Sequence, residues 1–271
     1  MMRALWTGAS GMIAQQLNVD NIANNLANIN TTGYKREGME FKSLLYETIQ
    51  EQSTDSEGQP KPVGIQVGLG VRSSAVSSQF TQGPFTETEN PWDFAISGDG
   101  FFAIQTQDGS RVYSRNGTFQ VAAGVEGMTL ATSDGQLVLD TNGQPIVFPE
   151  DCQVSEIIVD SDGIFYYPDE NELAQPMGIQ IGLVQFKNAQ GLQKLSNSAF
   201  KETESSGLAT WEVSEGVKSK SKLLQKCVES SNVQAATEMV NLIIAQRAYE
   251  MNSKVITASD TMMQQANNLK Q

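Results

Sequence analysis

The fold of this chain is decided at its two ends, beginning with residues 1–30, MMRALWTGASGMIAQQLNVDNIANNLANIN. This stretch carries little charge, is rich in asparagine, and repeats apolar residues at intervals of seven. Such spacing places them on one face of a helix and is typical of a coiled-coil seam. The residues of this predicted seam are Leu5, Met12, Val19 and Leu26, flanked by Ile22 and Ile29.

The other end of the chain, residues 233–271, has the same character. Its apolar residues follow alternating steps of four and three, with a last step of seven: Ile244, Ala248, Met251, Val255, Ala258, Met262 and Leu269. We therefore expect long helices over 3–29 and about 233–269, paired as a coiled coil. Asn232 is placed to cap the second helix, and Gly33 to end the first segment in a left-handed conformation.

The middle of the chain has a β pattern, with short apolar alternations separated by turn dipeptides. Asn-Gly and Asp-Gly pairs between such runs are the strongest local hairpin signal, because these residues tolerate positive φ. The six pairs begin at Asp99, Asp108, Asn116, Asp134, Asn142 and Asp162. They predict a central antiparallel β domain of sandwich or barrel type.

The expected fold class is therefore α+β, with terminal helices, a central all-β domain and an extended arm. The predicted segments are an N-terminal coiled-coil helix, a connecting segment with the arm, the β domain, and a C-terminal coiled-coil helix region, over 1–32, 33–72, 73–216 and 217–271. Within the connecting segment, residues 39–50 suggest a short helix or a mixed segment. Residues 51–62, EQSTDSEGQPKP, indicate a linker or an extended arm.

Charge separates the middle of the chain from its ends. The net charge is -13, while residues 1–36 carry +2 and residues 233–271 carry none, which leaves about -15 between them. No basic surface is present to neutralise phosphates, so nucleic acid is excluded as a partner. An acidic middle between neutral helices suits a protein that assembles through its ends.

The residue types needed for catalysis or metal binding are scarce. The chain has no histidine, and Cys152 and Cys227 lack the spacing of a redox or zinc pair. The stretch Asp160–Gly163 is similar to the start of a calcium loop, but Glu170 lies at the wrong spacing, which favours a hairpin turn. We expect no catalytic site, no cofactor and no metal.

Targeting signals are also missing from the sequence. The first residues contain one basic residue and polar interruptions where a cleavable signal peptide would have an apolar core. No stretch is long and apolar enough to span a bilayer, so we expect no membrane insertion. The lack of a signal peptide and of a membrane span would predict a cytoplasmic protein, but this inference does not hold for proteins exported without cleavage.

Six asparagines in the head helix need an explanation, because asparagine is a poor helix former. One interpretation is a solvated face. The alternative is that amides buried between helices fix register and partner choice. The apolar seam alternates with these positions, which favours the second interpretation for Asn18, Asn21, Asn24, Asn25, Asn28 and Asn30.

These residues also carry a family resemblance. The run DNIANNLAN at 20–28, followed by TGYK at 32–35, resembles the signature of the flagellar rod and hook proteins. So do the tail blocks at 240–243, 246–250 and 252–254. The runs at 93–102 and 113–119 look like the entry to the β domain of that family. The resemblance covers essentially the whole chain and assigns the family signature to Asn21, Asn24, Asn25, Asn28, Gly33, Arg247, Tyr249 and Asn252.

The resemblance implies a structural role without enzymatic activity. Subunits of this family form a hollow helical tube in the flagellar basal body, with terminal helices lining it and the β domain outside. It implies a homopolymer in the cell envelope, adjoining proximal rod and hook proteins and surrounded by ring proteins. It also implies export by the flagellar type III apparatus without a cleaved signal peptide. Phe41 and Leu45 fit the Phe-x-x-x-hydrophobic export element of such substrates.

Within the family, length and head sequence are similar to the distal rod members. Hook members usually have a much larger middle and lack the additional segment at about 47–64, which we expect to stiffen the polymer. The alternatives are another rod or hook axial protein, or a secreted β-domain glycan-binding protein or enzyme with helical appendages. A soluble binding module is a third class, which electron microscopy would separate from a polymer.

Overall fold

The chain forms two compact units in the computed structural model. The terminal unit contains Met1–Ala27, Glu37–Ser77 and Gln234–Gln271, and the β unit contains Asn28–Arg36 and Ser78–Val233. The residues described are 2–50, 64–124, 127–149, 157–168, 174–195, 198–214 and 219–269. Three features considered above lie outside them: the arm at 51–62, Cys152 and Glu170.

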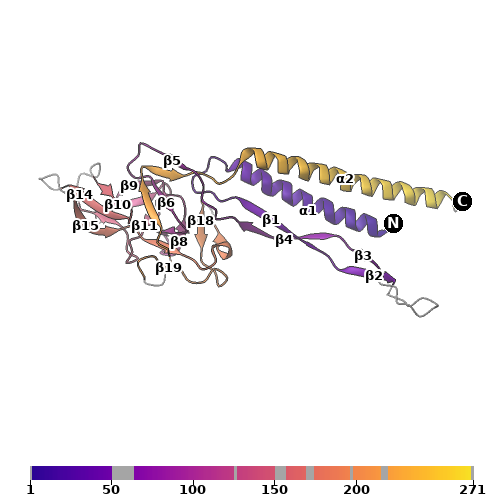
Figure 1. Ribbon diagram of the computed structural model, residues 1–271, viewed down its shortest axis with the longest axis horizontal. Coiled ribbons are helices and arrows are strands. Elements are labelled where there is room, and N and C mark those ends of the chain that lie inside the picture. The colour runs from indigo at the N-terminus through magenta and orange to yellow at the C-terminus, as the bar shows by residue number, and fades with distance from the viewer. Residues whose placement is uncertain are drawn as a thin grey trace. The chain divides into compact units, whose positions relative to one another are not determined.

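Two helices dominate the terminal unit and confirm the predicted helical ends. Helix α1 (Met2–Ala27) and helix α2 (Ala235–Asn268) lie side by side and run in opposite directions (Figure 1). The predicted Asn232 cap is wrong, because α2 begins after Gln234, which makes no side-chain capping hydrogen bond. The Asn232 amide instead donates to the backbone carbonyl of Gln79, at 2.9 Å.

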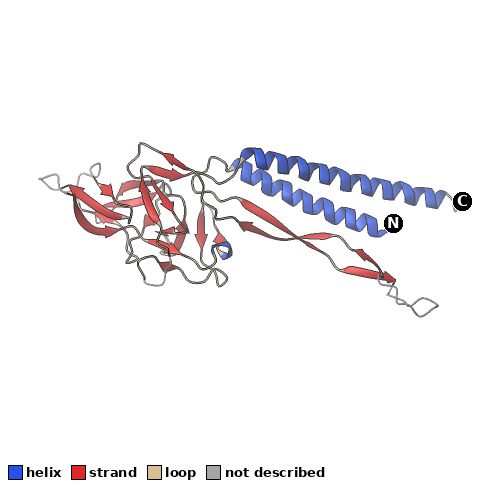
Figure 2. Cartoon of the chain, in the orientation of Figure 1, coloured by secondary structure: helices blue, strands red, loops and turns tan. Residues whose placement is uncertain are grey.

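The rest of the terminal unit is a two-stranded β ribbon. Strand β1 (Glu37–Ser43) pairs with β4 (Val71–Ser78), and β2 (Tyr46–Gln50) pairs with β3 (Ile65–Gly68), as Figure 2 shows. The alternative of a short helix over 39–50 is therefore wrong. Strand partners distant in sequence satisfy the backbone here, and such pairing overrides local periodicity.

The β unit contains a large antiparallel sheet, which confirms the predicted central β domain. In the described part of the chain this sheet has ten strands, and its main path runs β12-β10-β11-β7-β8-β18-β17. Strand β9 pairs with β10, while β16 joins β7 to β19. The strands are β7 (Phe101–Gln105), β8 (Arg111–Ser114), β9 (Phe119–Ala123), β10 (Met128–Thr132), β11 (Leu137–Val138), β12 (Val147–Phe148), β16 (Leu183–Gln185), β17 (Gln193–Lys194), β18 (Ala199–Lys201) and β19 (Thr210–Trp211).

Strand β7 is the centre of the core because both of its faces are buried. Successive side chains of a strand point to opposite faces, and here they enter two apolar clusters. Phe102 and Ile104 belong to the larger cluster, whereas Phe101 and Ala103 belong to the smaller one. The Phe102 ring meets Phe119 edge to face, with centroids 5.0 Å apart. This unit therefore has a core of its own.

Smaller sheets complete the β unit. One consists of β13 (Ile158–Val159), β14 (Ile164–Pro168) and β15 (Ala174–Gln180). Two pairs join segments distant in sequence: β6 (Phe94–Ser97) with β20 (Lys222–Gln225), and β5 (Phe85–Glu87) with β21 (Cys227–Glu229). A single 3-10 turn covers Ala189–Gly191 in the described chain. The β unit ends at Val233, and the terminal unit resumes at Gln234.

Four of the six predicted turn dipeptides occupy turns with a positive-φ glycine. They are the turns at Gly109, Gly135, Gly143 and Gly163. Gly163 closes the turn from Asp160, whose carbonyl accepts its N–H at 2.9 Å, so the calcium-like stretch is a turn between β13 and β14. The pairs at 99–100 and 116–117 differ, because neither Gly100 nor Gly117 has positive φ.

Candidate assembly site on the terminal helices

The contact between α1 and α2 is made of small and polar residues. Gly8 and Gly11 are buried, and a Cβ atom on Gly8 would lie 2.9 Å from Ile256 Cγ1. A Cβ atom on Gly11 would lie 2.8 Å from the amide nitrogen of Asn252. Small side chains at a contact let helix axes approach closely. The two helices of one chain therefore meet at small residues of α1, against which side chains of α2 such as Ile256 and Asn252 pack.

The predicted seam of α2 lies beside this contact rather than in it. Ile244 and Met251 are 61% and 60% exposed, whereas Ala245, the residue after Ile244, is buried. Likewise, Asn252 packs on α1 while Met251 does not. The chain itself leaves exposed the predicted seam residues Ile244, Met251, Val255, Ala258, Met262 and Leu269, whereas Ala248 is half-buried.

The predicted seam of α1 is intermediate in burial. Ile22 is buried, and Ile29 lies after the end of the helix, in the segment assigned to the β unit. The remaining members, Leu5, Met12, Val19 and Leu26, are half-buried. Val19 and Tyr249 also line a shallow groove of about 400 Å³ on the helix pair.

We call Ile244, Met251, Val255, Ala258 and Met262 the outer stripe of α2. They keep heptad spacing, so they form one continuous apolar line along the helix. Leaving these five side chains in water is unfavourable, because burying apolar surface lowers the free energy by about 25 cal/mol per Å². The outer stripe is a surface suited to another helix.

Two of the signature asparagines anchor the β ribbon to α1. The Asn25 amide donates to the backbone carbonyl of Glu37 and accepts from the N–H of the same residue, both at 2.9 Å. Asn21 donates to the same carbonyl at 3.1 Å. The Asn25 amide also lies 3.5 Å from the carboxylate of Glu238, which is buried in the first turn of α2. These buried amides act inside one chain by fixing the start of β1.

The remaining asparagines and the signature residues of α2 are more exposed. Asn24 lies 3.4 Å from the carboxylate of Glu37, and Asn28 accepts from the Thr31 hydroxyl. Arg247 forms an exposed ion pair with Glu250 at 2.9 Å, a kind of pair that contributes little to stability. Asn252, as described above, packs on α1.

The ribbon follows α1 toward its N-terminus. Gly70, with φ of +119°, passes so close to α1 that a Cβ atom would lie 2.2 Å from the Ser10 hydroxyl. Further along, Arg3 of α1 pairs with Glu47 of β2 at 2.6 Å. The predicted export pair lies on this ribbon. Leu45 is 83% exposed, and Phe41 is partly exposed.

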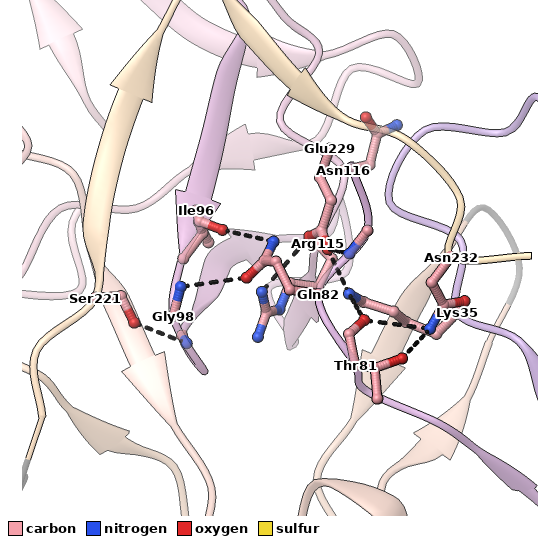
Figure 3. Close-up of polar contacts among 12 residues, drawn as sticks. Lys35, Thr81, Gln82, Ile96, Gly98, Arg115, Asn116, Ser221, Glu229 and Asn232 are labelled. Carbon is pink, nitrogen blue, oxygen red and sulfur yellow. Dashed lines mark hydrogen bonds and ion pairs between the residues drawn. The ribbon is translucent and has the colours of Figure 1, made fainter. Parts of the chain in front are cut away.

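A second polar site lies within the β unit, next to Gly33. Its φ is +68°, and a Cβ atom would lie 2.6 Å from the backbone nitrogen of Asn116, so no other residue fits. Two residues later, Lys35 reaches the buried carboxylate of Glu229, and Arg115 lies on the other side of that carboxylate (Figure 3). Burial lowers the pKa of Lys35 and of Arg115, and the charge of Glu229 opposes both shifts.

This buried ionic site is what sequence reasoning missed. Lys35 and Glu229 are 194 residues apart, and neither has a local pattern that distinguishes it from a surface charge. In the described residues, no group of three or more acidic, cysteine or histidine side chains could hold a metal ion. Neither described helix has the length and apolar character needed to cross a membrane.

Family models match three parts of this chain. Residues 5–35 match "Flagella basal body rod protein", 95–167 match "Flagellar hook protein FlgE/F/G D1 domain", and 224–269 match "Flagellar basal body rod FlgEFG protein C-terminal". The flagellar basal-body rod protein FlgG of Borreliella burgdorferi is 44% identical over 274 residues, which covers 100% of this chain and 99% of the relative.

The chain belongs to the flagellar basal-body rod family. FlgG of Caulobacter vibrioides is 41% identical, over 99% of this chain and 100% of the relative. FlgG of Bacillus subtilis is 36% identical, over 100% of both. This rod protein is accordingly a structural subunit of the flagellar distal rod. The family consists of structural proteins of the flagellar basal body.

Proposed function

We propose that this chain polymerises into a hollow helical tube that transmits motor torque and passes export substrates. The observation that carries the proposal is the outer stripe of α2, an apolar heptad line that its own α1 leaves uncovered. A terminal helix of a neighbouring copy would cover this stripe, so the predicted coiled-coil seam would form between subunits. Contacts that repeat head to tail without closing generate an open filament.

Torque transmission follows from such an arrangement. Interlocked helices resist shear better than loops do, and the neutral ends of the chain suit a channel through which unfolded chains pass. The β unit, which carries most of the acidic charge, would face outward toward ring proteins. Proximal rod and hook proteins would adjoin the ends of the polymer in the cell envelope. In this role the protein has no catalytic activity.

The test compares two substitutions on α2. Val255→Asp puts a charge in the outer stripe, and burying an unpaired charge costs several kcal/mol. Thr257→Asp puts the same charge at an exposed position outside the stripe. Electron micrographs of basal bodies should show no rods with Val255→Asp and normal rods with Thr257→Asp. Normal rods and motility with both variants would contradict the proposal.

The export pair gives a second, separate test. We propose that Phe41 and Leu45 serve recognition by the flagellar type III apparatus, without a cleaved signal. Because both side chains are exposed on the ribbon, their loss removes little packing. Phe41→Ala should reduce the secreted fraction while the cellular level stays normal. Unchanged secretion together with lost rods would show that Phe41 is a packing contact only.

We also propose that the arm at about 47–64 makes the polymer straight and stiff. The support is the resemblance, because rod members carry additional residues here that hook members usually lack. An arm that reaches a neighbouring subunit would oppose the sliding that lets a tube curve. Pro60 and Pro62 would reduce the entropy lost on docking. Deleting 52–62 should give curved rods in micrographs, and straight rods would eliminate this role.

A further inference from the structure

The buried ionic site holds one anion between two cations. Lys35 Nζ lies 2.5 Å from Glu229 Oε1, and Arg115 Nη1 lies 3.5 Å from Glu229 Oε2. All three side chains are 1% exposed. The same Oε1 accepts the backbone N–H of Gly83 at 2.8 Å, and Lys35 also donates to the carbonyl of Thr81 at 2.9 Å. Glu229 therefore draws together residues from four separate positions in the sequence, as Figure 3 shows.

Neutral hydrogen bonds join the same segments. The backbone N–H of Gly33 donates to the backbone carbonyl of Glu229 at 2.7 Å. Asn232 Oδ1 accepts the backbone N–H of Arg36 at 2.7 Å, and its amide nitrogen donates to Gln79 and Thr81. Hydrogen bonds from side chains and backbone thus connect three segments, 33–36, 79–83 and 229–232.

These segments are the ones through which the chain passes between its two units. The chain crosses between units at 27/28, 36/37, 77/78 and 233/234. Each crossing lies within about six residues of a residue held in this site. Any force that one unit exerts on the other along the chain must pass through these four links.

An ionic centre is a costly way to join segments. Buried ion pairs are often matched or exceeded in stability by apolar residues of similar volume, so their presence is weak evidence for stability. Removing one partner is different, because it leaves an uncompensated charge in the interior. Here Glu229 neutralises two buried cations, so its loss would expose both to that penalty.

We propose that Glu229, Lys35 and Arg115 form a clamp that holds the chain crossings together, so that a load entering through one crossing is shared among all four. This inference rests on the proposed function, because only a torque-carrying subunit needs it. Without the clamp the segments would still be covalently continuous, but each would stretch or open separately. The clamp predicts local opening rather than loss of the β core.

Hydrogen exchange on the purified full-length chain tests the local effect. Glu229→Gln keeps the shape and removes the charge. The matched control is Glu212→Gln, because Glu212 is also buried, accepts from neutral donors of Ser221 and Gln185, and acts on the charge of Arg115 less strongly than Glu229 does. We expect the Gly33 amide to exchange about 100-fold faster in Glu229→Gln. Amides that pair β7 with β8 should keep their protection, and Glu212→Gln should leave Gly33 unchanged.

Three outcomes would overturn the clamp. They are an unchanged Gly33 amide in Glu229→Gln, equal acceleration at Gly33 and in β7, and equal acceleration at Gly33 by Glu212→Gln. A double variant adds an independent criterion. If Lys35 acts through Glu229, adding Lys35→Met to Glu229→Gln should accelerate Gly33 exchange no further, whereas additive effects would show independent sites.

Swimming under load tests the mechanical consequence. Cells with Glu229→Gln should assemble normal rods and swim at normal speed in dilute medium, but should swim more slowly than cells with the unaltered chain in viscous medium. Cells with Glu212→Gln should not. Absent rods or undiminished swimming in the Glu229→Gln cells would refute the clamp. The proposed function fails on a different result, which is normal rods and motility with Val255→Asp.

Discussion

The two units of this chain bury opposite kinds of residues. The β unit encloses phenylalanines from both faces of β7, and its rings pack edge to face. The buried residues of the terminal helices are mainly glycine, alanine, serine and asparagine, with Ile22 and Glu238, while isoleucine, methionine and valine of the outer stripe remain exposed. One unit is stabilised by its own core. The other presents outward the residues that a core would need, which is the arrangement expected of a subunit completed by its neighbours.

The largest effect should come from the β core. Phe102 is fully buried and packs on Phe119, so Phe102→Ala leaves a cavity and should cost about 3–5 kcal/mol in the free energy of unfolding. Denaturant unfolding followed by near-ultraviolet circular dichroism measures this loss. A cost below about 1 kcal/mol would mean that the β unit does not depend on its own core, and the comparison would fail.

A smaller effect should come from the anchor of the ribbon. Asn25→Ala removes both hydrogen bonds to the Glu37 backbone and should destabilise the terminal unit by about 1–3 kcal/mol. Exchange of the Glu37 amide should accelerate accordingly. Asn24→Ala is the matched control, since Asn24 is exposed, and it should leave that amide within about twofold of its original rate. Equal effects of the two substitutions would argue against the anchor.

The outer stripe should matter least to the isolated chain. Met251→Ala removes a large apolar side chain that is mostly exposed, so the unfolding free energy of the monomer should change by less than about 0.5 kcal/mol. The same variant should weaken polymerisation, measured as sedimenting material over a concentration series. A monomer strongly destabilised by Met251→Ala would place this residue inside the chain's own packing.

Tyr113 should affect the stability of the β unit at high pH and not at neutral pH. Burial, with the nearby Glu202 carboxylate, raises the pKa of Tyr113 from 10.0 to about 12. The folded chain then holds a proton that the unfolded chain releases, so stability falls as pH rises from about 10 to about 12. Tyr113→Phe should lose less stability over that window and match the unaltered protein at pH 7. Parallel pH profiles for the two proteins would show that burial does not control this group.

The sequence was a good guide to elements and a poor guide to contacts. Heptad spacing located both helices, and Asp-Gly and Asn-Gly pairs located four β turns, because both signals are local. The helix contact was displaced by one position, from Ile244 to Ala245 and from Met251 to Asn252. Apolar periodicity locates the apolar face of a helix. The contact between the two helices of this chain instead lies at glycines and asparagines, which periodicity does not reveal.

Other features could not be predicted because their partners are distant in sequence. Residues 39–50 fold as strands only because 65–78 lie beside them. Lys35 becomes a buried cation only because Glu229, 194 residues away, returns to meet it. The family resemblance identified the asparagine signature, but it did not show that Asn25 binds the backbone of Glu37.

The terminal unit is assembled from three separate stretches of the chain, one from each end and one from between. A polypeptide that emerges with its N-terminus first therefore presents α1 long before α2 exists to pack on it. The outer stripe is absent until residues 244–262 have followed. On the proposed function, the order of emergence delays assembly, because the outer stripe that a neighbouring copy would cover appears only when nearly all of the chain has emerged.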